Sequence, residues 1–125
     1  MIAKLRCVVL DCADVIGLSR FYRWLLGGEV DQPDPRWSLD DGWATLHTEG
    51  GSVLAFQRVG DYQPPRGRDL VLRQRFHLDL EVRDPDQAQA DVLDLGATLL
   101  DDAEAKRGWR IFAGPAGHPF CLVRH

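Results

Sequence analysis

The sequence is poor in sulfur and has no long hydrophobic run. It has three cysteines and one methionine in 125 residues, and Cys7, Cys12 and Cys121 lack metal-finger spacing. An odd number of cysteines without such spacing suits the reducing cytoplasm, where thiols are packing residues or weak ligands. No apolar run approaches the ~20 residues of a membrane span. Charged residues interrupt the N-terminal stretch, so we expect no secretory signal either.

Positive charge is also in short supply. The 15 Lys and Arg residues are outnumbered by 19 Asp and Glu residues, which gives a formal net charge of −4 at pH 7. Such a chain has no general electrostatic attraction for phosphate backbones or anionic lipid surfaces. We therefore expect neither a nucleic acid nor a membrane as partner.

What the sequence does contain is an internal repeat. Residues 7–28 form an apolar, strand-like run that ends in Asp14, then a segment with helical period, then a Leu-Gly stop. Residues 77–96 follow the same order, with Asp84 in the place of Asp14. Because a repeat constrains the architecture before any single motif is considered, the chain is predicted to consist of two similar half-size units.

Hydrophobic period and turn residues divide each half in the order β-α-β-β-β. In the first half, Leu18, Phe21, Trp24 and Leu25 recur at helical spacing, which predicts one buried helix face. The pattern predicts helices over 17–27 and 85–95 and strands over 4–12, 29–31, 36–39, 44–48, 52–59, 75–82, 98–100, 109–113 and 119–124.

This order predicts an α+β fold in a single domain, residues 1–125. We expect a first βαβββ unit at 1–59, a linker at 60–73 and a second unit at 74–125. A doubly wound parallel sheet would need regular strand–helix alternation, which is absent. Two such units are expected to form a curved, half-open mixed sheet or barrel with helices outside, and a concave cavity lined by alternate strand residues.

Several segments carry a resemblance to a known family. They are His77-Leu-Asp-Leu-Glu-Val-Arg-Asp84, Leu95-Gly-Ala-Thr98, the closing stretch Trp109–Leu122, Phe21-Tyr22 with Leu26-Gly27, and Leu54–Val59. Together they resemble the glyoxalase/bleomycin resistance/extradiol dioxygenase family, the vicinal oxygen chelate superfamily, over nearly the whole chain. Its catalytic members hold a divalent metal in the concave face, with ligands, mostly His and Glu, from the first and last strand of each half. One scaffold serves several reactions there, so the resemblance implies a fold more than a reaction.

The resemblance transfers four ligand positions to this chain. His77, seven residues before Asp84, stands at the first-strand position of the second half. Cys7, seven residues before Asp14, is its counterpart by the repeat. Cys121 stands at the last-strand acidic position of the second half.

The fourth position is reached by aligning Phe120 with Phe56, which places Gln57 opposite Cys121 in the repeat. Only His77 is then of a usual ligand type, because both expected carboxylate positions are neutral. Hard cations such as Mg²⁺ prefer oxygen, and the two-histidine, one-carboxylate triad of iron dioxygenases is absent. We therefore expect no cofactor.

Two alternatives stay open for the thiols. Cys7 and Cys121 are either buried packing residues or, with His77, ligands of a divalent metal (Zn, Ni or Fe). If the family's metal is absent, the resemblance implies a glyoxalase-like protein that binds a small organic molecule in the cavity. The alternative is a metal-dependent lyase, isomerase or dioxygenase.

Tryptophans are candidates for the wall of the expected cavity. Trp37, Trp43 and Trp109 fall in predicted strands, and those that face the cavity would give a small molecule a flat apolar wall. The sequence identifies no catalytic residue. Related single-domain chains usually pair, so the resemblance also implies a homodimer.

Overall fold

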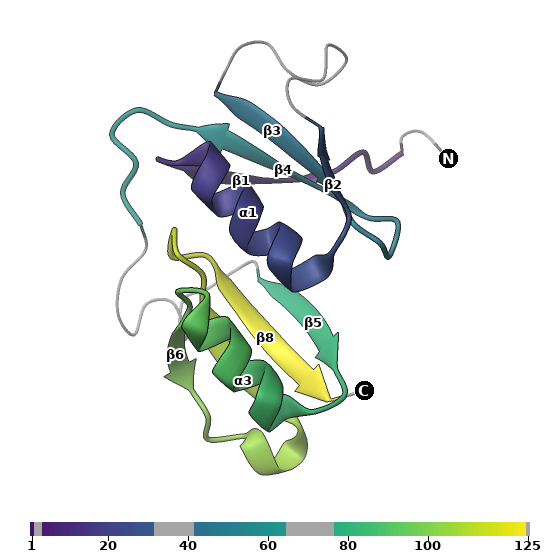
Figure 1. Cartoon of the computed structure of the whole chain (residues 1–125), viewed down its shortest axis with the longest axis vertical. Coiled ribbons are helices and arrows are strands. Elements are labelled where there is room, and N and C mark those ends of the chain that lie inside the picture. The colour runs from purple at the N-terminus through teal and green to yellow at the C-terminus, as the bar shows by residue number, and fades with distance from the viewer. Residues whose placement is uncertain (2–3, 32–41, 65–76, 125) are drawn as a thin grey trace. The chain divides into compact units, whose positions relative to one another are not determined.

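The computed structural model describes residues 1, 4–31, 42–64 and 77–124 (Figure 1). The chain divides into two compact units, Met1–Gln63 and Pro64–His125. This division falls inside the predicted linker 60–73, of which residues 65–73 lie outside the described residues. Each unit is therefore considered by itself.

The two units have the same order of elements. The first consists of β1 (Val8–Cys12), α1 (Val15–Leu26), β2 (Glu29–Asp31), β3 (Trp43–His47) and β4 (Val53–Arg58). The second consists of β5 (Leu78–Val82), α3 (Pro85–Asp94), β6 (Thr98–Asp101), the 3₁₀ helix η1 (Ala105–Arg107), β7 (Trp109–Ala113) and β8 (Pro119–Arg124).

Their sheets also have the same topology. The strand orders are β1-β4-β3-β2 and β5-β8-β7-β6, and in each sheet the first strand runs parallel to the last while the other pairs are antiparallel. Both sheets are mixed and open. The predicted α+β fold of two βαβββ units is confirmed.

The repeated aspartates begin the two long helices. The Asp14 carboxylate accepts a hydrogen bond from the Gly17 backbone nitrogen at 3.0 Å, and Asp84 accepts one from Gln87 at 3.1 Å. Both aspartates have φ −120° and ψ 95°. Each carboxylate satisfies one of the free N–H groups of the first turn, so the aspartate at the end of the first strand fixes where the helix starts.

Each unit has its own aromatic core between one helix and one sheet face. In the first unit α1 packs on β3 and β4, and the fully buried Tyr22 ring stacks on Phe56 with 5.7 Å between centroids. In the second unit α3 packs on β8 (Figure 1). There Phe112 and Phe120, both fully buried, stack at 5.5 Å.

The prediction for the buried face of the first helix was wrong at Trp24, and Leu25 is only half-buried. Trp24 is 72% exposed, while Leu18 and Phe21 are buried as expected, together with Val15 and Tyr22. Trp24 lies six residues after Leu18, and at ~100° per residue this places its side chain well away from the stripe that faces the sheet.

Element boundaries differ modestly from the prediction. β1 begins at Val8, not at residue 4, and η1 occupies a stretch expected to be irregular. The predicted strand 36–39 and the start of the predicted strand 75–82 lie outside the described residues. No helix in the described part of the chain is both long and apolar enough to cross a membrane.

The buried thiol of Cys12 predicts a loss of stability at alkaline pH. Cys12 is 1% exposed, and burial, followed by the charges of Asp14 and Asp11, raises its pKa from 9.0 to about 11. The folded state thus holds this proton more tightly than the unfolded chain. Its contribution to stability is complete below pH 9.0 and is lost as the pH rises to about 11.

We therefore expect the urea midpoint to fall between pH 9 and 11, and to fall less in Cys12→Ala than in the native protein. Cys7→Ala, which removes the half-buried thiol just before β1, serves as the matched control and should keep the native pH dependence. The same pH dependence in all three proteins would contradict the assignment to Cys12.

Candidate functional site

The second sheet has one face that α3 does not cover, called here its helix-free face. Side chains alternate between the two faces along a strand. Phe112, Phe120 and Leu122 are fully buried in the core, so the residues between them point to the helix-free face. Cys121 of β8 is among these, and it pairs in register with Asp79 of β5.

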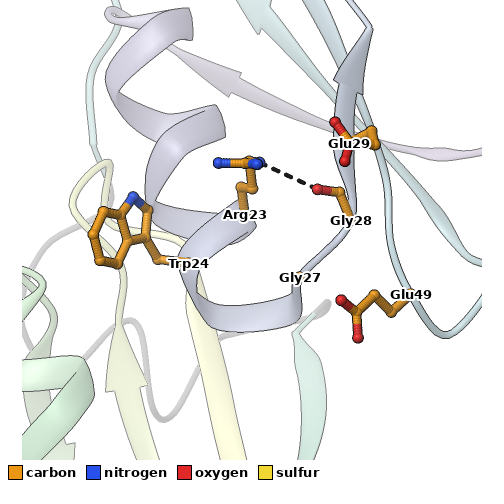
Figure 2. A pocket seen from close by; sticks show the side chains of 6 residues that line it. All are labelled: Arg23, Trp24, Gly27, Gly28, Glu29 and Glu49. Carbon is orange, nitrogen blue, oxygen red and sulfur yellow. Dashed lines mark hydrogen bonds between the residues drawn. The ribbon is translucent and has the colours of Figure 1, made fainter.

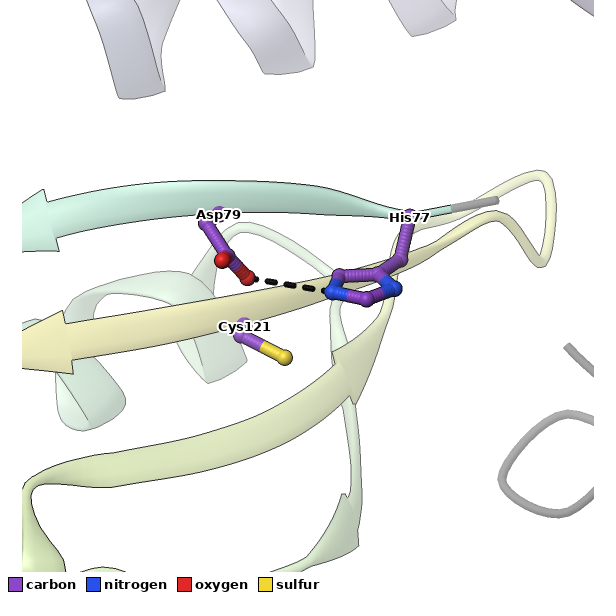
Figure 3. A group of neighbouring side chains, drawn as sticks. All are labelled: His77, Asp79 and Cys121. Atoms are coloured by element: carbon purple, nitrogen blue, oxygen red, sulfur yellow. Dashed lines mark ion pairs between the residues drawn. The ribbon is translucent and has the colours of Figure 1, made fainter. Parts of the chain in front are cut away.

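Three side chains with different donor atoms meet on this face. His77 lies just before β5 and two residues before Asp79, so the two point the same way. The His77 Nε2 atom lies 3.2 Å from Asp79 Oδ1, and the donor atoms of His77, Asp79 and Cys121 all lie within 4.8 Å of one another (Figure 3). The structure thus brings together two of the predicted site residues and adds a carboxylate.

Sequence reasoning missed Asp79 although its signal was present. In an alternating strand, the residue two after a cavity-facing histidine faces the same cavity. The ligand position that the family resemblance implies on the last strand is occupied by the neutral Cys121. The carboxylate is instead on its register partner, Asp79, which the resemblance does not single out.

The three side chains differ in exposure and in charge. The His77 and Asp79 side chains are 47% and 64% exposed, whereas Cys121 is 8% exposed. Burial of the thiol, together with the charge of Asp79 and a hydrogen bond to it, raises the pKa of Cys121 to about 11. In the metal-free site the thiol is therefore protonated at neutral pH, which argues against a nucleophilic cysteine.

A pocket of about 270 Å³ surrounds these residues. Its lining residues are His77, Asp79, Trp109, Cys121 and Val123. Trp109, at the start of β7, is 36% exposed. The pocket thus combines one aromatic surface with a few convergent polar groups, which is the usual composition of a small-molecule site.

In the first unit, the structure does not bring Cys7 and Gln57 together. Gln57 pairs with Asp11 on one side and Trp43 on the other, near the end of β4. Cys7 precedes β1, whose first residue pairs with Leu54. Cys7 is therefore displaced from Gln57 by about four residues, or roughly 13 Å, along the strands.

The alignment that selected Gln57 is wrong by two residues. Phe120 pairs with Leu78, which lies six residues before the capping aspartate of its helix. Phe56 pairs with Leu10, which lies only four residues before the capping aspartate of the first helix. The two phenylalanines thus occupy different levels of the repeat.

By register, the first-unit counterpart of Cys121 is Ala55, and Gln57 corresponds to Val123. Ala55 is fully buried and has no side-chain donor atom. The register partners of Ala55 are Val9 and Thr45, so this level of the first sheet has a buried hydroxyl but neither a carboxylate nor a thiol. Trp43 lies on the same strand face as Gln57, and Trp37 lies outside the described residues.

A second pocket lies at the C-terminal end of α1 (Figure 2). Its volume is about 550 Å³, and it is lined by Arg23, Trp24, Gly27, Gly28, Glu29 and Glu49. The Arg23 Nε–H donates to the Gly28 carbonyl at 3.1 Å, so this guanidinium helps to hold the turn into β2. The pocket is larger but has no histidine or thiol, and it is the weaker candidate for chemistry.

The donor atoms of His77, Asp79 and Cys121 fit zinc better than magnesium or calcium. Zinc accepts thiolate sulfur, imidazole nitrogen and carboxylate oxygen, usually with tetrahedral geometry. Magnesium and calcium require more oxygen ligands than one carboxylate supplies. The predicted set of Cys7, Gln57, His77 and Cys121, which draws on both units, stays a prediction.

Solved structures with the same fold cover nearly the whole chain. A hypothetical protein, SA1046 from S. aureus, is 18% identical, with a TM-score of 0.71 and coverage of 100% of this chain and 99% of that chain. The fosfomycin resistance protein FosX from Listeria monocytogenes is 15% identical, with a TM-score of 0.71 and coverage of 100% and 95%.

A glyoxalase/bleomycin resistance protein/dioxygenase family enzyme from Burkholderia phytofirmans PsJN is 21% identical, with a TM-score of 0.70 and coverage of 98% of both chains. At these identities the similarity establishes the fold alone. No curated protein matches the sequence. The glyoxalase-like domain family matches residues 7–123, and the chain therefore belongs to that family.

Proposed function

We propose that the protein binds a small organic molecule on the helix-free face of its second sheet and does so without the metal that catalytic members of its superfamily use. The observation that supports this proposal is the position of the Trp109 indole in one pocket with the His77–Asp79 pair. The indole offers an apolar surface for a flat ring, and the pair offers a few oriented polar atoms beside it.

The lining residues also indicate the chemistry of the ligand. Asp79 supplies the carboxylate of the pocket, and a carboxylate has about four lone-pair sites, of which His77 and Cys121 occupy two. Further donors on a ligand can therefore be accommodated. Val123 and Trp109 provide apolar contact. A small planar molecule with a hydroxyl or amine donor fits this arrangement, whereas a phosphate or carboxylate would be repelled by Asp79.

A metal-dependent lyase, isomerase or dioxygenase is the second candidate, and the presence of Asp79 favours it. A bound metal would supply Lewis-acid polarisation of a substrate oxygen. The residues would have to hold that metal and also provide a base. If Asp79 is a ligand, the residues that line the pocket around His77 include no further carboxylate that could act as a base. Metal-independent binding therefore remains the main proposal.

The proposal predicts saturable binding of a planar phenol in the absence of metal. We expect millimolar 2-naphthol, added with EDTA to the full chain, to shift the amide NMR signals of residues around Trp109 and to bind at least about tenfold more weakly to Trp109→Ala. Trp24→Ala, which removes an equally large but 72% exposed indole in the first unit, is the matched control. Equal affinity in Trp109→Ala, or binding that appears only after metal is added, would contradict the proposal.

The homodimer expected from the resemblance stays a prediction. Light scattering at micromolar protein concentration distinguishes a mass of twice 14.1 kDa from that of one chain.

A further inference from the structure

We infer that His77, Asp79 and Cys121 form a zinc site contained within the second unit. This ligand set differs from the one that the superfamily resemblance implies, because it uses Asp79 and needs no residue of the first unit. It concerns the same pocket as the proposed function but does not rest on it, and because both use His77 and Asp79, zinc and the organic molecule would compete for these side chains. The inference depends on three donor atoms of different kinds that lie within 4.8 Å of one another.

The backbone fixes two of the three ligands. Asp79 and Cys121 are register partners on the neighbouring parallel strands β5 and β8, with both side chains on the helix-free face. Neighbouring strands lie about 4.8 Å apart, so the two side chains start within reach of one ion. His77 follows from the alternation along the same chain segment, two residues before Asp79 (Figure 3).

The distances are close to those of a tetrahedral zinc site. Typical zinc bonds of 2.0–2.3 Å imply tetrahedral donor–donor separations of about 3.3–3.8 Å. The His77 Nε2 to Asp79 Oδ1 distance is 3.2 Å, and no pair in the group exceeds 4.8 Å. Rotations of side chains by small angles are therefore enough to close the site around an ion, and the strands need not move.

The charge of the group also suits a divalent ion. Binding replaces the proton of the Cys121 thiol by zinc, and that proton leaves to solvent. The thiolate and the Asp79 carboxylate then balance the two positive charges, while His77 binds as a neutral imidazole. The exposure of His77 and Asp79, 47% and 64%, leaves the fourth position open to water. An open fourth position is the arrangement of reactive zinc sites, not of closed structural ones.

The test uses the full chain with zinc and with cobalt as a spectroscopic substitute. We expect one zinc ion per chain by calorimetry and, with cobalt, a near-ultraviolet charge-transfer band from the thiolate. Cys121→Ser should abolish that band, and Asp79→Asn and His77→Ala should each weaken zinc binding on the order of 100-fold. Far-ultraviolet circular dichroism confirms that each variant is folded.

Cys7→Ser is the matched control, because Cys7 is the first-unit thiol that the family pattern would recruit. Its zinc affinity and cobalt band should be those of the native protein. Three results would overturn the inference: no zinc binding at micromolar concentration, native affinity in Asp79→Asn, or loss of the cobalt band in Cys7→Ser. Binding of 2-naphthol in EDTA is measured separately, so failure of the zinc site and failure of the proposed function are distinguishable.

Discussion

Gly28→Ala is expected to destabilise the first unit by roughly 3–5 kcal/mol, because backbone strain and a steric clash act together. Gly28 has φ +101°, a conformation that residues with a Cβ rarely adopt. An added Cβ would overlap the carbonyl oxygen of His47 and lie 2.8 Å from the Cα of Thr48. Both atoms belong to the backbone of a paired strand and the turn after it, since His47 pairs with Glu29. No side-chain rotation can relieve this contact.

Gly51→Ala is the matched control for that change. Gly51 also has a positive φ, +90°, but an added Cβ there meets nothing within 4 Å. We expect it to cost only the backbone term, about 1–2 kcal/mol. Urea unfolding with a constant m-value measures both changes. Equal costs in the two variants would show that strain, and not the contact with His47, decides the requirement for glycine at Gly28.

Phe120→Ala is expected to cost about 3–5 kcal/mol in the second unit, which is the usual range for removing a fully buried ring. Phe120 is fully buried, and its ring stacks on Phe112 with 5.5 Å between centroids and 16° between planes. The cavity left behind would lie between α3 and the sheet, beside the Phe112 ring. The measurement is the free energy of unfolding from urea titration.

Trp24→Ala provides the comparison for that ring deletion. The indole removed is larger, but it is 72% exposed, so the change should stay within about 0.5 kcal/mol of the native protein. A loss of less than about 1 kcal/mol in Phe120→Ala would mean that the second unit repacks around the missing ring.

The fold was predictable because its signals are local and occur twice. Asp14 and Asp84 each cap a helix directly after a strand, and a Leu-Gly stop begins 12 residues after Asp14 and 11 residues after Asp84. Capping and hydrophobic period depend on residues a few positions apart. The sequence could therefore predict the kind and order of the elements. β1 is shorter than predicted because the exposed residues 4–6 do not pair with a neighbouring strand.

The candidate site was less predictable because it depends on register. Whether Cys121 is next to Asp79 or elsewhere is decided by the pairing of β5 with β8, which are separated by about forty residues of chain. Matching phenylalanines between the repeats gave a register two residues off and selected Gln57. The pairing of backbone atoms, not the similarity of side chains, determined that Ala55 stands at that level.

The parallel pairing of first and last strand in each unit has a consequence for synthesis on the ribosome. Val8 pairs with Leu54, so β1 cannot form its hydrogen bonds to β4 until most of the first unit has been synthesised. The β3–β4 hairpin needs no such distant partner and can form as soon as it emerges. β1, with its exposed Val9, must meanwhile remain without its ladder. While residues 9 to 54 are being synthesised, β1 thus has no strand partner and is open to pairing with other chains.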